Sequence, residues 1–289
     1  MNEQSEQSIT VIGAGVIGLC CARTLQRRGY GVTVIDPLDP GMGTSYGNAG
    51  ILATGSVLPE GKPGLWKRVP GMLLDPLGPL TIRPSYLAKL TPWMLRFIAN
   101  TTAKRSEEIS QALASIVLPG LEHYRALLDD VASDEVPIRQ QGCLYLYPSA
   151  ANLAAARDDI ETRRQRGVAL EMLSPDEVRQ LVPAIGPDMA GGALATQSGH
   201  ATSPLALSQL LAARIVADGG NFIKAKASGF AIGSDGPTHV HTDQGDIPVR
   251  AVVVAAGAFS KPLAKSLGNT VPLDTERGYH MMLPQPGID

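Results

Sequence analysis

The chain of 289 residues has only three cysteines, and two of them, Cys20 and Cys21, are adjacent. They do not form a disulfide framework, so the sequence suits a reducing compartment. The net charge of −2 argues against the basic stripe of a nucleic-acid-binding surface. Glycines interrupt the apolar run that follows "MNEQSEQS", so neither a signal peptide nor a membrane span is expected. We therefore expect a soluble cytoplasmic protein with one large domain or two interleaved ones.

The first thirty-six residues contain the strongest local pattern of the chain. An apolar run over 9–12 predicts a strand that is buried on both faces of a parallel sheet. A G-x-G-x-x-G motif over 13–18 follows at once, and residues 20–28 have helical character up to Gly29. A second apolar strand over 32–35 leads to Asp36. The segment therefore reads as a complete β-turn-α-β unit.

Each part of this unit has a physical task in binding a dinucleotide. Gly13 allows the tight turn, Gly15 lets the backbone approach a pyrophosphate, and Gly18 lets helix and strand pack closely. The helix N-terminus offers unpaired N–H groups, and Asp36 can accept hydrogen bonds from a ribose hydroxyl. We predict these cofactor-binding residues: Gly13, Ala14, Gly15, Val16, Ile17, Gly18 and Asp36.

The glycine-rich segment from Pro37 to Pro59 separates this chain from a standard NAD-binding domain, which would continue with another helix and strand. Such a segment can lie along a cofactor and donate backbone N–H groups, with Thr44, Ser45 and Asn48 as further side-chain donors. The alternative is a flexible surface loop, and composition does not exclude it. There is no second G-x-G-x-x-G in the sequence, so a separate NAD(P) domain is not expected.

The segments "VIGAGVIG", "VID" and "GTSYGNAG" resemble the D-amino-acid oxidase superfamily of FAD oxidoreductases. Later segments, "GSVLPEGKPG", "MLLDPLGPLTIR" and "TERGYHMML", resemble its bacterial D-amino-acid dehydrogenase branch in particular. The resemblance implies FAD as the cofactor, with Thr44, Ser45, Asn48 and Gly50 beside the pyrophosphate and flavin. It also implies a backbone contact with the adenine near Ala227.

The expected fold class is α/β, a Rossmann-type FAD-binding domain with an inserted α+β substrate domain. We assign 1–55 and 200–275 to the first, and 56–199 with 276–289 to the second. Strands are expected at 143–147, 222–230 and 251–255, a hairpin turn at Gln244-Gly245, and helices at 107–131, 152–166 and 204–218, with a capping box begun by Ser174. Ligands sit at the carboxyl ends of such buried strands, so Ala256 and Gly257 are expected to approach FAD.

Thr91-Pro92 predicts the start of another helix, with Thr91 as N-cap and proline in the first position. Its apolar residues Trp93, Met94, Phe97 and Ile98 fall on one face. With Lys89 and Arg96 nearby, that face could lie on a membrane surface. Ordinary core packing is the simpler interpretation, and it is the one we prefer.

A substrate carboxylate calls for an arginine, whose planar fork binds two oxygens. Arg277 and Tyr279, in a strand that the family resemblance leads toward the flavin, are the candidate catalytic residues. For Arg277, an ion pair with Glu276 or Asp274 is an equal alternative. His239, His241 and Asp243 share a strand face but lack a fourth ligand, so no metal site is predicted.

The resemblance implies FAD-dependent oxidation of D-amino acids to imino acids, which hydrolyse to 2-oxo acids. Glycine, sarcosine or hydroxyproline-type amines stay open as substrates, and so does the electron acceptor: a quinone, a protein or oxygen. Family members continue beyond "LPQPGID", so a truncated, non-catalytic nucleotide-binding fragment, or one part of a larger flavoenzyme, is the alternative. Association with the inner face of the membrane is a further expectation.

Overall fold

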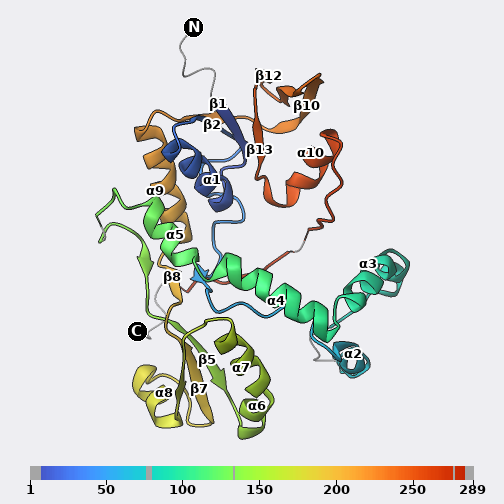
Figure 1. The fold of residues 1–289 in the computed structure, drawn as a ribbon, viewed down its shortest axis with the longest axis vertical. Helices are drawn as coiled ribbons and strands as arrows, with labels where there is room; N and C mark the ends of the chain where they lie inside the picture. The colour runs from blue at the N-terminus through green and yellow to red at the C-terminus, as the bar shows by residue number, and fades with distance from the viewer. Residues whose placement is uncertain (1–7, 76–79, 133, 276, 284–289) are drawn as a thin grey trace. The chain divides into compact units, whose positions relative to one another are not determined.

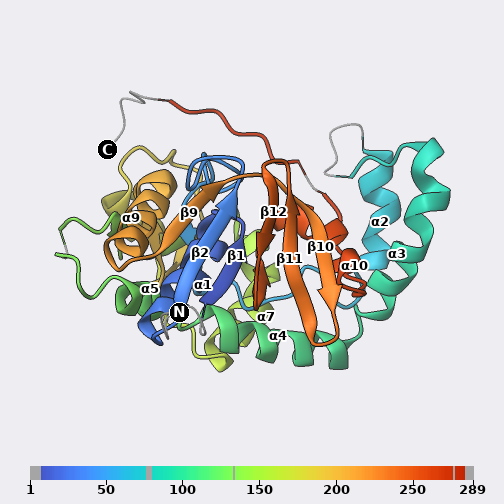
Figure 2. The same cartoon turned by 90° about the horizontal axis from the view of Figure 1, so that it is seen from above.

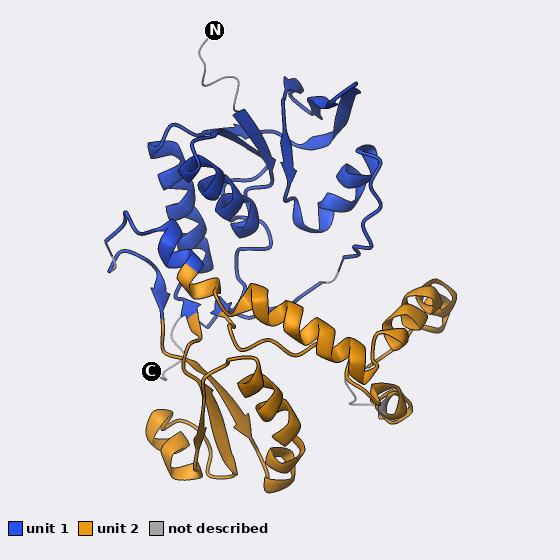
Figure 3. Cartoon of the chain, in the orientation of Figure 1, with its two compact units in different colours: residues 1–51, 123–139, 200–289 blue, residues 52–122, 140–199 orange. Residues whose placement is uncertain are grey.

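The computed structural model describes residues 8–75, 80–132, 134–275 and 277–283. The chain forms two compact units, coloured separately in Figure 3. Unit 1 contains 1–51, 123–139 and 200–289, and unit 2 contains 52–122 and 140–199. This division differs from the expected one, because it places 123–139 and the described residues after 275 in unit 1. The assignment of cofactor and substrate to separate domains stays a prediction.

The centre of unit 1 is a parallel sheet with the strand order β13-β1-β2-β9. Its strands are β1 (Ser8–Ile12), β2 (Gly31–Asp36), β9 (Asn221–Lys224) and β13 (Val252–Val254). Helices α1 (Val16–Arg27) and α9 (Pro204–Ala217) pack together beside it (Figures 1 and 2). Val11, Leu19, Leu211 and Ile215 are fully buried between these elements. The predicted β-turn-α-β unit and the α/β class are confirmed.

A second sheet of unit 1 is antiparallel, with β10 (Ala227–Gly233), β11 (Gly236–Thr242) and β12 (Gly245–Pro248). Thr242 pairs with Gly245, which confirms the hairpin but places its two-residue turn at 243–244, one residue before the expected position. The strand expected over 222–230 is divided, because the chain leaves the parallel sheet after Lys224 and enters the antiparallel one at Ala227. A 3-10 turn (Gly257–Phe259) and α10 (Ser260–Ser266) follow β13.

Unit 2 contains the antiparallel sheet β5-β7-β6, formed by Cys143–Tyr147, Gly191–Ala195 and Leu170–Leu173. Its helices include α2 (Leu65–Leu74), α3 (Leu87–Ala99), α4 (Ala103–Val117), α6 (Ala150–Ala155), α7 (Arg157–Gln165) and α8 (Pro175–Leu181). Helix α8 carries the expected capping box of Ser174 and Glu177. Val57, Ala114, Val168 and Ala195 form a buried cluster. A small sheet, β3-β8-β4 (Ile51–Leu52, Gly199–Ala201, Ile138–Arg139), lies where the chain passes between the units.

Two of the predicted helices are each two helices in the structure. The one expected over 107–131 is interrupted between α4 and α5 (Gly120–Leu127), at Pro119, which has no N–H group to continue the helical hydrogen bonds. The one expected over 152–166 consists of α6 and α7, separated at Ala156.

The helix predicted to start at Thr91-Pro92 begins earlier in the structure. Helix α3 spans Leu87–Ala99, follows a 3-10 turn (Pro84–Tyr86), and keeps Pro92 in its interior. The Thr91 hydroxyl donates to the carbonyl oxygen of Leu87 at 2.7 Å, so Thr91 is not an N-cap. The preferred interpretation of core packing is also wrong, because α3 contains no buried residue.

Candidate functional site

The glycine-rich turn joins β1 to α1 at the carboxyl end of the parallel sheet. Gly13 has φ +114°, and a Cβ atom there would lie 2.3 Å from the carbonyl oxygen of Ala255. At Gly18, a Cβ would lie 1.9 Å from the carbonyl oxygen of Gly13. A side chain at either position would enter the neighbouring backbone, so the strand–turn–helix packing depends on both glycines.

Asp36 ends β2 and is tied to this turn. One carboxylate oxygen accepts a hydrogen bond from the N–H of Ala14 at 2.7 Å, and the other accepts from Leu38 at 2.8 Å. Each carboxylate oxygen has a second lone pair, so Asp36 keeps acceptor capacity for a ribose hydroxyl. The aspartate therefore shapes the turn and also presents a carboxylate beside it.

The segment after β2 packs on the turn. Gly41 N–H donates to the carbonyl oxygen of Ala14 at 2.9 Å, and the Ser45 hydroxyl accepts from Val16 N–H at 2.9 Å. Only 8% of Ser45 is exposed. These contacts fix the loop at the N-terminal end of α1, so the alternative of a free surface loop is not supported.

Asn48 and Thr44 have different surroundings from Ser45. The Asn48 amide donates to the carbonyl oxygen of Ser45 at 2.9 Å, and its side-chain oxygen accepts from Gly50 N–H at 2.8 Å. The Asn48 side chain thus closes the turn of its own loop. The expected role was a hydrogen bond from Asn48 to the cofactor. Thr44 is exposed on the same loop. Gly50 has φ +67°, and its carbonyl oxygen accepts from Ala201 N–H at 2.7 Å.

The residues expected near FAD from the later part of unit 1 lie at the same end of the sheet. Ala255 N–H donates to the carbonyl oxygen of Ile12 at 2.8 Å, so Ala256 and Gly257 follow directly beside the glycine-rich turn. Ala225 N–H donates to the carbonyl oxygen of Asp36 at 3.2 Å, and Ala227 begins β10 two residues later. The fold thus gathers these predicted residues from four strand ends.

This arrangement fits a dinucleotide. A Cβ at Gly15 would have the Ser45 hydroxyl, at 3.4 Å, as its nearest neighbour, so the missing side chain leaves the start of α1 approachable. Ile17, on the first turn of α1, is 66% exposed although it is apolar. An open helix N-terminus beside a carboxylate provides N–H groups for a pyrophosphate and an acceptor for a ribose.

Among the described residues, neither candidate catalytic residue forms a hydrogen bond or ion pair with the glycine-rich turn. The strand expected around them is wrong, because residues 277–283 form neither helix nor strand and pair with no described strand. Arg277 is exposed, and Tyr279 is 87% exposed. No ion pair of Arg277 occurs among the described residues, and Glu276, one of its two expected partners, lies outside them.

Two glycines of this loop, Gly41 and Gly47, have neighbours that the sequence did not indicate. Gly41 has φ +80°, and a Cβ there would lie 2.6 Å from the Ser208 side chain on α9. His280 packs on Gly47, where a Cβ would lie 2.5 Å from its Nε2 atom. Both glycines stand in "DPGMGTSYG", but the sequence does not say which later residue each one meets.

The comparisons with known proteins agree with this geometry. Residues 8–289 match the family model described as "DAO: FAD dependent oxidoreductase". A D-amino-acid oxidase of Bradyrhizobium diazoefficiens is 39% identical over 96% of the chain, and a D-amino acid dehydrogenase of Rhodopseudomonas palustris is 31% identical over 96%. The chain spans 66% of the length of each of these two relatives.

Solved structures show the same fold at lower identity. A glycine oxidase from Geobacillus kaustophilus superposes with a TM-score of 0.60 at 21% identity, over 90% of this chain and 58% of the other. An L-amino acid deaminase from Proteus vulgaris gives 0.62 at 18% identity, over 91% and 56%. At these identities, the likeness carries the fold alone.

Proposed function

Since the chain belongs to the DAO family of FAD-dependent oxidoreductases, we propose that it binds FAD and belongs to an enzyme that oxidises D-amino acids or closely related amines. The observation that carries the proposal is the pair of hydrogen bonds made by the glycine-rich turn. The N–H of Ala14 donates to Asp36, and the N–H of Val16 donates to Ser45. A simple tight turn would need neither contact.

The proposed holding residues follow from the geometry. The first turn of α1, with Gly15 at its start, would receive the pyrophosphate, and Asp36 would receive the adenosine ribose. The loop around Ser45 and the turn at Ala256-Gly257 would flank the rest of the cofactor. Bound FAD would supply hydride acceptance from the substrate Cα, and water would then hydrolyse the imino acid to a 2-oxo acid.

The substrate class rests on similarity to the D-amino-acid oxidase and dehydrogenase relatives. Glycine, sarcosine and hydroxyproline-type amines stay within the proposal, because the described residues do not define a side-chain specificity pocket for the substrate. We keep Arg277 and Tyr279 as the proposed carboxylate-binding pair. Arg277 offers a planar fork, and no described acid competes for it. The electron acceptor is proposed to be a quinone, a protein or oxygen.

A spectroscopic titration tests both parts of the proposal. The purified chain is mixed with FAD, and the visible spectrum and flavin fluorescence are recorded before D-amino acids are added without oxygen. Binding followed by bleaching supports the enzyme. The variant Gly15→Val should lose flavin binding, whereas Gly43→Ala should keep it, because a Cβ at Gly43 meets no atom within 4 Å. Failure to bind FAD in the intact chain would refute the proposal.

A second candidate is a nucleotide-binding unit without turnover of its own. The observation that favours it is the exposure of both candidate catalytic residues, Arg277 and Tyr279. In that case, FAD binds but stays oxidised with every amine tested. Bleaching by any D-amino acid, glycine or sarcosine would eliminate this candidate.

A further inference from the structure

The helical pair α2–α3 of unit 2 has an unusual surface for a globular protein. It consists of α2 (Leu65–Leu74), the segment from Leu80 to Tyr86, and α3 (Leu87–Ala99). No described residue between 58 and 100 is buried. Yet both helices are apolar, with "LWKRVPGMLL" and "LAKLTPWMLRFIA" as their sequences. Helices of this composition usually cover a core, and here the described chain supplies no cover.

Large apolar side chains are concentrated on this pair. The chain has two tryptophans, and both are here: Trp66 is 54% exposed and Trp93 is 59% exposed. Leu74 is 83% exposed and Leu95 is 65% exposed. Single exposed apolar residues are ordinary, but a cluster on adjacent helices indicates a contact surface.

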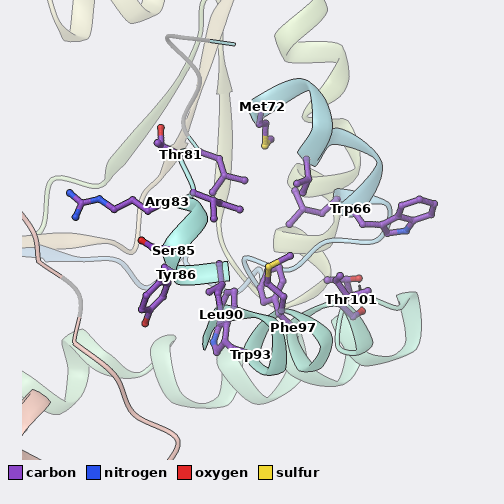
Figure 4. Close-up of a pocket in the computed structure, with 16 residues that line it drawn as sticks. Trp66, Met72, Thr81, Arg83, Ser85, Tyr86, Leu90, Trp93, Phe97 and Thr101 are labelled. Atoms are coloured by element: carbon purple, nitrogen blue, oxygen red, sulfur yellow. Dashed lines mark hydrogen bonds between the residues drawn. The ribbon is translucent and has the colours of Figure 1, made fainter. Parts of the chain in front are cut away.

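The two helices and the connecting segment also enclose an apolar pocket of about 900 Å³. Figure 4 shows Leu90 and Phe97 of α3 at this pocket, with Met72 of α2 above them and the Arg83 side chain extending away. The ring of Trp93 stacks on Phe97 with 5.0 Å between ring centroids. The pair therefore has an apolar interior that opens to its surface.

Basic residues surround this apolar surface. Between 61 and 105 the sequence has eight lysines and arginines and a single acid, Asp75, in a chain whose net charge is −2. Lys62 pairs with Asp159, and Arg105 pairs with Glu108. Four basic residues of the helical pair and its connecting segment form no ion pair with a described residue: Lys67, Arg83, Lys89 and Arg96.

The cations and the aromatic rings lie side by side. The ammonium of Lys67 is 5.6 Å from the ring centroid of Trp66, and that of Lys89 is 5.5 Å from the ring centroid of Tyr86. This combination matches a lipid interface, where tryptophan and tyrosine rings lie at headgroup level and basic side chains meet phosphates. A protein partner would need an apolar patch surrounded by acidic residues. An anionic bilayer offers apolar acyl chains and negatively charged headgroups over its whole surface.

We propose that α2 and α3 dock on the surface of an anionic phospholipid bilayer, with their apolar side chains inserted at headgroup depth. Trp66 and Trp93 lie in the interface, and Lys67, Arg83, Lys89 and Arg96 contact lipid phosphates. No helix within the described residues is long and apolar enough to cross a membrane, so the pair lies along the surface. The proposal does not depend on flavin binding or turnover.

The tryptophans provide a direct readout, because the whole intrinsic tryptophan signal comes from this surface. The intact chain is titrated with vesicles of phosphatidylcholine alone and with vesicles that also contain phosphatidylglycerol. We expect a blue shift of tryptophan emission, quenching by brominated acyl chains and co-sedimentation with the anionic vesicles only. Added salt should weaken binding, because it screens the charges. Equal binding to both vesicles, or no shift, would overturn the proposal.

Matched variants separate the apolar and the charged contributions. Trp93→Ser with Leu95→Ser should abolish co-sedimentation, and Lys89→Gln with Arg96→Gln should weaken it at least about tenfold. The controls are Ile116→Ser, an apolar residue of α4 that is 70% exposed, and Lys261→Gln with Lys265→Gln on α10. Both controls should bind as the parent does; equal losses in the controls would refute the assignment to α2 and α3.

A second copy of this chain is the competing occupant. Sedimentation velocity without lipid distinguishes the two: a monomer that binds anionic vesicles supports docking on the bilayer. A dimer that Trp93→Ser with Leu95→Ser converts to a monomer would overturn it.

Discussion

The glycine-rich turn of unit 1 and the helical pair α2–α3 of unit 2 differ in how closely the rest of the described chain packs against them. In the turn, a single added carbon at Gly13 or Gly18 would meet backbone within 2.3 Å. In the helical pair, no described residue from 58 to 100 is buried, although both helices are apolar. The turn is determined by its neighbours in the chain, and the pair has an apolar surface that the described chain leaves uncovered.

Replacing Gly13 is the most severe way to break the constrained region. Gly13→Ala combines a strained positive φ with a contact of 2.3 Å between Cβ and the Ala255 carbonyl oxygen. We expect the free energy of unfolding to fall by about 4 kcal/mol, the sum of strain and overpacking, with loss of flavin binding. Denaturant titration of the variant measures the fall. Gly43→Ala is the control, and a similar loss there would mean that the loop tolerates no substitution for another reason.

The contrast between the two regions explains what the sequence could predict. Gly13, Gly18 and Asp36 act on neighbours that the β-turn-α-β pattern already specifies, so the strands, α1 and the turn were predictable. The pairing of Gly41 with Ser208, or of Gly47 with His280, joins distant segments, and no local pattern encodes such a pairing. Helix amphipathicity likewise shows that a face is apolar, and it does not say whether a core covers it.

That limit explains the errors around α3 and at the end of the described chain. Trp93 and Phe97 have the spacing of a core-facing stripe, but neither is buried: Trp93 is 59% exposed and Phe97 is half-buried. The apolar alternation near Tyr279 is typical of a strand, but a strand needs a neighbour for its backbone hydrogen bonds. The described residues provide none for 277–283.

A titration to alkaline pH tests how strongly the packing around α1 favours the neutral thiol of Cys20. Burial raises the pKa of this thiol from 9.0 to about 11, the hydrogen bond with Tyr124 partly offsets the rise, and the neighbouring Cys21 adds to it. The unfolded chain therefore loses this proton first, so the stability contribution is complete below pH 9 and disappears as pH rises toward 11. Relative to Cys20→Ala, the parent should lose about 2 kcal/mol between pH 8 and pH 11. Parallel stability curves for the two proteins would contradict this assignment.

The next smaller effect distinguishes Ser45 from its neighbour Thr44. Ser45→Ala removes the acceptor of the Val16 N–H at the start of α1, which should lower the free energy of unfolding by about 1 kcal/mol. Thr44→Ala should leave stability within about 0.5 kcal/mol, because Thr44 is exposed. Thermal unfolding measures both. If Thr44 also contacts the cofactor, its variant weakens FAD binding at unchanged stability; a stability loss as large as that of Ser45→Ala would show a packing role instead.

The smallest expected effect is that of a substitution in the helical pair α2–α3. Leu74→Ser replaces a large apolar side chain, and at 83% exposure it has little burial to lose. The free energy of unfolding should therefore change by less than about 0.5 kcal/mol. Leu19→Ala, a fully buried change on α1, should cost about 3 kcal/mol because it removes apolar contacts and leaves a cavity. Both losses in free energy of unfolding are measured by the same denaturant titration without lipid, and their ratio shows how differently the two regions depend on packing. A loss above 1 kcal/mol for Leu74→Ser would mean that the chain itself covers α2 in solution, and the face would then not be available to a membrane.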